Sequence, residues 1–126
     1  MLQRVRQLQN DNPHYVHADY SQVSTGGLII PTLTITNSSQ APKPYCLVTA
    51  RLHPGETQGS WTVDGFLSLL CSPKGHFLRQ NYIFVVIPMV NVDGVVLGNF
   101  RTGIGGRDLN RVFDSPSRYT EVALIR

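Results

Sequence analysis

Hydrophobic and polar positions follow a helical spacing in some parts of the chain and a strand-like spacing in others. The apolar residues of segment 2–8 lie three positions apart, which predicts a short amphipathic helix ending at the polar residues 10–13. Within residues 28–36, Leu33 and Ile35 alternate with threonines, as is typical of a strand. The polar stretch between these two elements is interpreted as a loop.

The middle of the chain predicts two strands with a helix between them. Residues 45–50 are interpreted as a buried strand, and residues 83–87 form a β-branched apolar run that ends before a proline. Residues 61–70 carry apolar side chains at helical spacing, so a helix packed on the sheet is expected there. Trp61 and Phe66 are assigned to the core between this helix and the sheet.

The last third of the chain is rich in glycine. Glycines recur over residues 94–106, which predicts a long irregular loop. Ser115 followed by proline is typical of a helix start, and a helix is expected from there to Arg126. Strands that alternate with helices indicate an α/β fold, with a sheet flanked by helices on at least one face.

Composition narrows the class of protein. The chain has 126 residues, of which 41% are hydrophobic and 15% charged, so it is interpreted as one folded domain rather than a disordered segment. Its formal net charge is +3, and no block of like charges points to nucleic acid. No apolar run approaches the length of a membrane span, so no membrane association is expected. Cys46 and Cys71 are interpreted as free thiols rather than as a bridge.

The first candidate site lies where the strand at 45–50 ends. His53 and Glu56 stand three residues apart, with a Pro-Gly turn between them, so the imidazole and the carboxylate can face one ion. Zinc accepts both types of ligand. Loops at the carboxyl ends of strands are where open α/β sheets place their sites. Taken alone, the pattern occurs often by chance and favours a polar loop before a helix over a metal site.

Two further segments carry polar chemistry. Residues 91–94, Asn-Val-Asp-Gly, follow the strand at 83–87 and are interpreted as a tight turn facing the same crevice. The glycine-rich loop contains arginines and an asparagine, which can hold a carboxylate or stabilise an oxyanion. Asp108 can accept a hydrogen bond from a metal-bound histidine. Phosphate contact or plain surface charge is the alternative for these arginines.

Four motifs in order resemble the zinc metallocarboxypeptidases related to carboxypeptidase A, and the cytosolic carboxypeptidase subfamily in particular. They are His-Pro-Gly-Glu at 53–56, Asn-Val-Asp-Gly at 91–94, Gly-Asn-Phe-Arg at 98–101 and Gly-Arg-Asp-Leu-Asn-Arg at 106–111. The resemblance extends from about residue 24 to the end. It implies a mixed β-sheet flanked by helices, forming part of a carboxypeptidase A-like domain.

The resemblance also implies a role for each matching residue. It makes His53 and Glu56 two of three ligands of one Zn²⁺, and Asp108 the carboxylate that orients His53. It makes Arg101 the residue that polarises the scissile carbonyl. The expected binding site for the substrate's terminal carboxylate is the pair Asn110 and Arg111.

The family's third ligand, a histidine, and its general-base glutamate have no counterpart after Arg111. Residues 1–126 are therefore expected to be one partial catalytic domain, cut before both groups and inactive alone. The implied activity is removal of C-terminal residues, glutamates above all, from acidic protein tails such as polyglutamylated tubulin. A cytoplasmic and cytoskeleton-associated location is implied with it. Two alternatives stay open: a non-catalytic relative that binds C-terminal carboxylates, and a zinc amidohydrolase of acylated amino acids.

Overall fold

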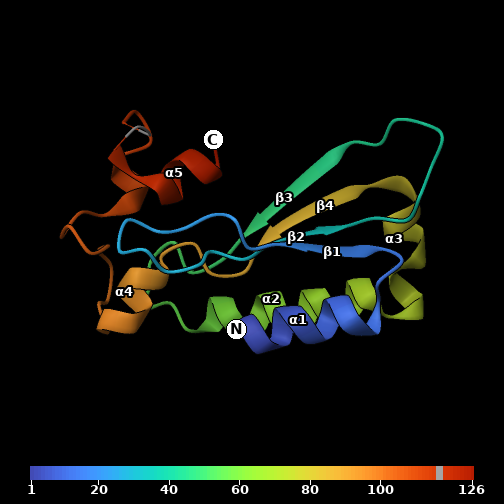
Figure 1. Cartoon of the computed structure of the whole chain (residues 1–126), viewed down its shortest axis with the longest axis horizontal. Coiled ribbons are helices and arrows are strands. Elements are labelled where there is room, and N and C mark those ends of the chain that lie inside the picture. Colours follow the sequence, from blue (N-terminus) through green and yellow to red (C-terminus); the bar gives the residue numbers. More distant parts are fainter. Residues whose placement is uncertain (116–117) are drawn as a thin grey trace.

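The computed structural model describes residues 1–115 and 118–126 (Figure 1). Its elements, in chain order, are α1 (Leu2–Asp11), β1 (Val16–Asp19), β2 (Thr32–Ile35), β3 (Tyr45–Thr49), α2 (Gln58–Cys71), α3 (His76–Asn81), β4 (Ile83–Ile87), α4 (Val92–Leu97) and α5 (Thr120–Leu124). Two short 3₁₀ helices lie at Pro73–Gly75 and Leu109–Arg111.

The four strands form one mixed sheet in the order β1-β2-β4-β3. β2 pairs antiparallel with both β1 and β4, whereas β3 and β4 run parallel, with Tyr45 opposite Ile83 and Thr49 opposite Ile87. The connection between the parallel strands passes through α2 and α3, as a parallel crossover requires. The expected mixed sheet flanked by helices is confirmed.

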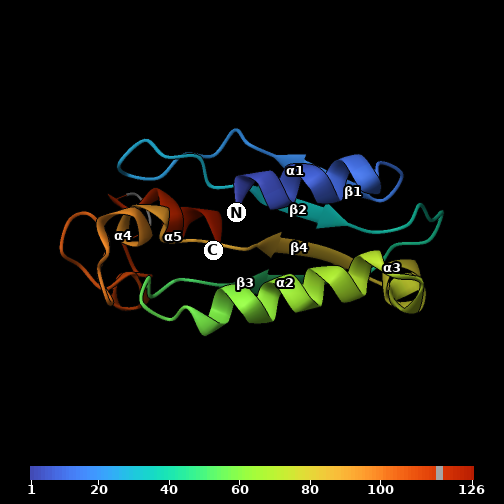
Figure 2. The same cartoon turned by 90° about the horizontal axis from the view of Figure 1, so that it is seen from below.

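Helices α1 and α2 cover the same face of the sheet (Figures 1 and 2). Of the apolar positions predicted for α1, Val5 and Leu8 are buried, whereas Leu2 is exposed. The core beneath the two helices consists of Val5, Leu8, Val16, Leu33, Ile35, Val63, Leu67, Leu70, Phe84 and Val86. The predictions of α1 and of the strand at 83–87 are thus confirmed, and the strand expected within residues 28–36 is β2, which covers Thr32–Ile35.

Two predictions about burial were wrong. β3 is an edge strand rather than a buried one, and its Tyr45 and Leu47 are 75% and 50% exposed. Trp61 of α2 is 79% exposed, because the helix turns Val63 and two leucines toward the sheet instead. Phe66, the other aromatic residue assigned to the core, does pack against it, edge-on to Phe84.

Several boundaries also differ from the prediction. β1 lies in the stretch taken for a loop, and α3 follows α2 after the 3₁₀ helix at Pro73–Gly75. The long loop expected over residues 94–106 begins inside α4. The C-terminal helix starts at Thr120 rather than at Ser115, and residues 116–117 of that prediction lie outside the described residues.

None of the helices in the described part of the chain combines the length and the apolar character needed to cross a membrane.

Candidate metal centre

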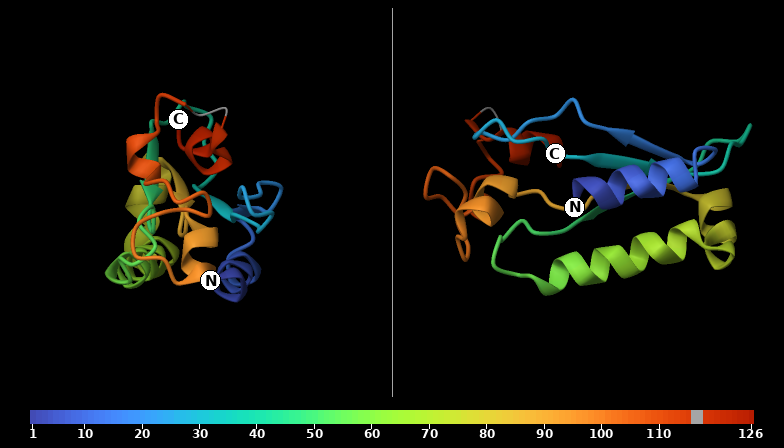
Figure 3. Two further views of the ribbon diagram at one scale, coloured as in Figure 1. Left: turned by 90° about the vertical axis from the view of Figure 1, so that its left-hand side faces the viewer. Right: turned by 60° about the horizontal axis from the view of Figure 1, so that its bottom comes forward.

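The carboxyl ends of the parallel strands β3 and β4 bring the first two motifs together. Asn91, just after β4, donates its backbone N–H to the carbonyl of Arg51 at 3.0 Å and its side-chain amide to the carbonyl of Leu52 at 3.2 Å. The loop carrying His53 is thereby fastened to the segment before α4. Figure 3 shows α4 and the glycine-rich loop beyond this same end of the sheet.

Residues 91–94 are not the plain turn that their composition suggested. Asn91 is fully buried and caps α4, since its side-chain oxygen accepts from the N–H of Gly94 at 2.9 Å. Asp93 is 2% exposed and accepts from the Ser24 hydroxyl at 2.6 Å and from the N–H of Gly26 at 2.8 Å. Through these buried hydrogen bonds, the segment connects α4 to the loop before β2.

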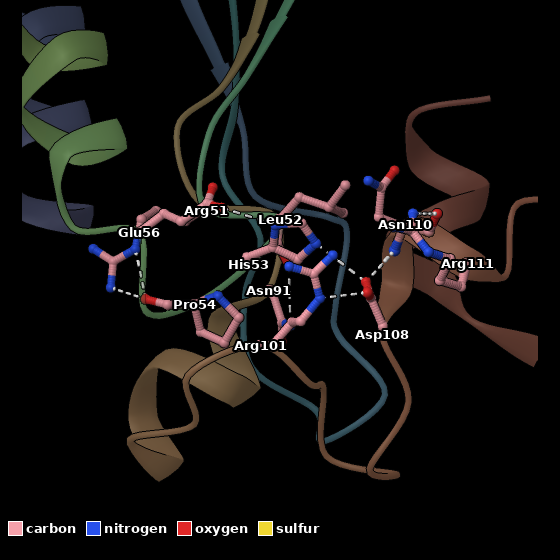
Figure 4. A network of polar contacts seen from close by, with 10 residues as sticks. All are labelled: Arg51, Leu52, His53, Pro54, Glu56, Asn91, Arg101, Asp108, Asn110 and Arg111. Atoms are coloured by element: carbon pink, nitrogen blue, oxygen red, sulfur yellow. Dashed lines mark hydrogen bonds and ion pairs between the residues drawn. The ribbon is translucent and has the colours of Figure 1, made fainter.

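His53 lies between two carboxylates (Figure 4). Its Nδ1 is 3.0 Å from Oε1 of Glu56, and its Nε2 is 3.2 Å from Oδ1 of Asp108. The His53 side chain is 12% exposed, whereas that of Glu56 is 50% exposed. One ring nitrogen therefore faces an accessible carboxylate, and the other faces a more sheltered one.

The spacing of the Nδ1 and Oε1 atoms fits a shared zinc ion. Zinc–ligand bonds of about 2.1 Å in a tetrahedral arrangement place two ligand atoms about 3.4 Å apart. A small opening of the 3.0 Å contact between His53 and Glu56 would meet that separation. The second nitrogen then stays free to donate to Asp108, which is the usual partner type for a metal-bound histidine. The donor set is thus chemically suited to zinc.

Asp108 joins two loops. One is the loop between β3 and α2, residues 50–57, which carries His53 and Glu56 and is called the metal loop below; the other is the glycine-rich loop. Besides facing His53, Asp108 accepts from Nε of Arg101 at 2.7 Å and from the N–H of Asn110 at 2.9 Å. Burial of the carboxyl opposes its ionisation, but the hydrogen bonds from Arg101, Asn110 and His53 and the charge of Arg101 outweigh this effect and lower the pKa of Asp108. Asp108 is therefore held as an anion beside the imidazole.

The remaining predicted site residues, Arg101, Asn110 and Arg111, lie near Asp108 (Figure 4). Arg101 is 44% exposed. Asn110 and Arg111 form the 3₁₀ helix with Leu109, and both are exposed. Among the described residues, the Arg111 guanidinium donates one hydrogen bond, to the neighbouring carbonyl of Asn110 at 3.1 Å. All six predicted site residues thus occur in one region (Figure 4).

The described residues contain no group of three or more His, Cys, Asp or Glu side chains placed to hold a metal ion. Of the six predicted residues, His53 and Glu56 are the pair whose atoms converge on one point, and Asp108 binds the opposite side of the imidazole.

Comparison with known families agrees with this geometry. The zinc carboxypeptidase model, Peptidase_M14, matches residues 1–123. The chain belongs to the zinc carboxypeptidase family. Membership of this family agrees with the mixed sheet and with the position of the His53 loop at the carboxyl end of β3.

Curated members of the zinc carboxypeptidase family are similar over most of the chain. Cytosolic carboxypeptidase 2 of Danio rerio is 50% identical over 102 residues, covering 75% of this chain and 14% of the relative. Cytosolic carboxypeptidase 1 of Gallus gallus is 38% identical over 128 residues, covering 92% of this chain and 10% of the relative. The chain thus spans between a tenth and a seventh of these proteins.

Solved zinc carboxypeptidase structures share the fold. A metallo-carboxypeptidase from Burkholderia cenocepacia superimposes with a TM-score of 0.89 at 28% identity, covering 98% of this chain and 35% of that one. A metallo-carboxypeptidase from Pseudomonas aeruginosa, solved in complex with (2-guanidinoethylmercapto)succinic acid, gives 0.80 at 26% identity, with 98% and 34% covered. The carboxypeptidase A-like fold is therefore confirmed.

Proposed function

We propose that residues 1–126 form part of the catalytic domain of a zinc metallocarboxypeptidase, in which His53 and Glu56 are two of the zinc ligands. The observation that carries this proposal is the position of the His53 imidazole, which has one nitrogen toward Glu56 and the other toward Asp108. Zinc bound there would supply a water molecule activated for attack on the peptide carbonyl.

The neighbouring side chains have distinct roles in this proposal. Asp108 accepts the Nε2 proton of His53, so that Nδ1 presents its lone pair to the metal. Arg101 donates to the other carboxylate oxygen of Asp108, and its partly exposed guanidinium supplies donors for the oxygen of the scissile carbonyl. Asn110 and Arg111 bind the substrate's terminal carboxylate, for which the planar guanidinium fork of arginine is suited. Such a pair restricts cleavage to the end of a chain.

The proposed substrates are acidic C-terminal tails of proteins, with glutamates of polyglutamylated tubulin as the specific candidate. The support is twofold: the similar curated proteins are cytosolic carboxypeptidases, and three exposed arginines, at 101, 107 and 111, lie on the same segment as Asp108. The same names support a cytosolic location, and a tubulin substrate would place the protein on the cytoskeleton.

We further propose that the 126 residues alone do not catalyse hydrolysis. They supply two zinc ligands where a catalytic site of this type uses three, and the described residues offer no third. The buried carboxylate of Glu121 is engaged by the N–H and hydroxyl of Thr25, both at 3.0 Å, so it does not act as the general base. The missing ligand and base would come from sequence outside these residues.

The experiment that tests the zinc assignment is a titration of the chain with Zn²⁺, followed through the imidazole NMR signals of its four histidines. Such signals report even weak binding by a two-ligand site. We expect zinc to shift the His53 signals, and Glu56→Gln to raise the dissociation constant at least tenfold. His17→Ala is the matched control, because His17 is exposed on β1. His53 signals that move no more than those of His17 would refute the assignment.

The same samples show whether the 126-residue chain hydrolyses a peptide by itself. Release of glutamate from a glutamate-tailed peptide, abolished by His53→Ala, would disprove the proposed inactivity. Peptide binding that needs Arg111 and a free C-terminal carboxylate, without turnover, is the result we expect.

A further inference from the structure

Arg51 has an unusual backbone conformation. Its φ is +56°, and it is the single non-glycine residue with positive φ in the described part of the chain. Left-handed backbone is unfavourable for a residue with a Cβ atom, whereas glycine adopts it freely. Arg51 stands at the point where the chain leaves β3, two residues before His53. An arginine in this unfavourable conformation indicates that its side chain has a functional role.

The Arg51 side chain folds back over the metal loop (Figure 4). Its Nε and Nη2 both donate to the carbonyl of Pro54, at 2.9 and 2.5 Å. Its Nη1 donates to the hydroxyl of Ser60, in the first turn of α2, at 2.7 Å. The guanidinium thus joins the middle of the loop between His53 and Glu56 to the helix that follows it.

Two backbone hydrogen bonds also hold the same loop. The carbonyl of Arg51 accepts from the backbone N–H of Asn91 at 3.0 Å, and the N–H of Gly55 donates to the carbonyl of Phe100 at 2.7 Å. Pro54 lies between His53 and Gly55 and has no N–H. Its carbonyl is therefore the one backbone group of this residue that can form a hydrogen bond. Arg51 is the residue that binds it.

We propose that Arg51 is a positioning residue, whose guanidinium holds the Pro54 carbonyl so that His53 and Glu56 keep the spacing needed for one metal ion. The left-handed turn at Arg51 directs its side chain along the loop rather than along the strand. The consequence for metal binding rests on the proposed function, whereas the ordering of the loop does not.

The competing role for Arg51 is direct binding of an acidic substrate. Each of its three nitrogens already donates to an oxygen of Pro54 or Ser60. The side-on pair of donors, Nε and Nη2, is occupied by the Pro54 carbonyl, so a substrate carboxylate could not bind this pair without displacing that contact. The structure therefore favours positioning, and the two roles predict different effects of substitution.

The first test measures amide hydrogen exchange in the metal-free chain. In Arg51→Gly and Arg51→Lys, we expect protection of the Gly55 and Glu56 amides to fall at least tenfold, while that of Val86 in the sheet core stays unchanged. Glycine removes the unfavourable backbone conformation as well as the guanidinium, so the stability of Arg51→Gly to urea should not fall. A purely structural role would lower loop protection and overall stability together.

Arg4→Ala is the matched control for this test. The Arg4 guanidinium also binds α2, through Asp64 at 2.7 Å and Ser68 at 2.9 Å, but it lies away from the metal loop. Its removal should leave Gly55 and Glu56 protected as in the wild type. Protection within threefold of wild type in Arg51→Gly would overturn the proposal.

The second test measures zinc affinity through the His53 signals. We expect Arg51→Gly to raise the dissociation constant at least tenfold, and Ser60→Ala to raise it less, because the Pro54 contact remains. Absence of zinc binding in the wild type would refute the proposed function, while hydrogen exchange still decides the role of Arg51. Loss of acidic-peptide binding in Arg51→Lys, with loop protection intact, would refute positioning in favour of substrate binding.

Discussion

A glycine-to-alanine substitution at position 94 tests the packing that supports the metal loop. Gly94 lies in α4, where alanine would be favoured by helix propensity over glycine by roughly 0.5–1 kcal/mol. A Cβ atom there would lie 2.7 Å from Cγ of Pro54, 2.7 Å from the carbonyl oxygen of Thr102 and 2.8 Å from Oδ1 of Asn91. None of these neighbours is the end of a long flexible side chain.

The steric cost should therefore exceed the propensity gain. Overpacking of buried positions typically costs about 1–3 kcal/mol, so we expect Gly94→Ala to lower the free energy of unfolding by roughly 1–2 kcal/mol. For a chain of this size that corresponds to a decrease in Tm of about 3–10 °C. Because Pro54 is one of the displaced neighbours, zinc affinity should fall as well.

Gly65→Ala is the matched control for this prediction. Gly65 is an exposed residue in the interior of α2, and a Cβ atom there would have no neighbour within 4 Å. The substitution should raise the free energy of unfolding by roughly 0.5–1 kcal/mol. Urea denaturation followed by circular dichroism measures both variants. A Gly94→Ala protein as stable as the wild type would refute the packing argument.

Two further predictions concern carboxylates outside the metal loop. Ser24→Ala should lower the free energy of unfolding by about 1–3 kcal/mol, because it leaves the buried Asp93 with one backbone donor; unchanged urea stability would contradict this. The backbone N–H of Ser21, followed by its hydroxyl, lowers the pKa of Asp19. The stability that Asp19 contributes is therefore present above its ordinary pKa of 3.8 and is lost as pH falls through the lower pKa of the folded state. Urea titrations between pH 6 and 2 should show a smaller acid-induced loss in Asp19→Asn, and equal losses would disprove the effect.

Local pattern was sufficient for the elements whose apolar spacing is regular. Helix α1, the strands β2 and β4 and the body of α2 follow from spacing because each buries one continuous stripe or run. The site residues His53 and Asp108 are 55 positions apart and were placed together through the order of four motifs, not through any local rule. Their contact agrees with that resemblance.

Spacing was insufficient where two apolar stripes compete on one helix. Trp61 and Val63 both lie on α2, and the sequence does not show which of them faces the sheet. Packing decides it, since the stripe through Val63, Leu67 and Leu70 fits over the strands and leaves Trp61 exposed. β3 likewise has the composition of a buried strand, but its place at the sheet edge depends on which strands pair.

By itself, the sequence determined the α/β class, the family and the identity of the candidate ligands, because these depend on residue types in a fixed order. Tertiary structure decided how those ligands are held. Asn91 was interpreted as part of a turn and Arg51 was assigned no role, yet both hold the loop of His53 by hydrogen bonds once β3 and β4 pair in parallel. Side-chain roles of this kind arise from contacts between loops, and the spacing of residues along the chain does not encode them.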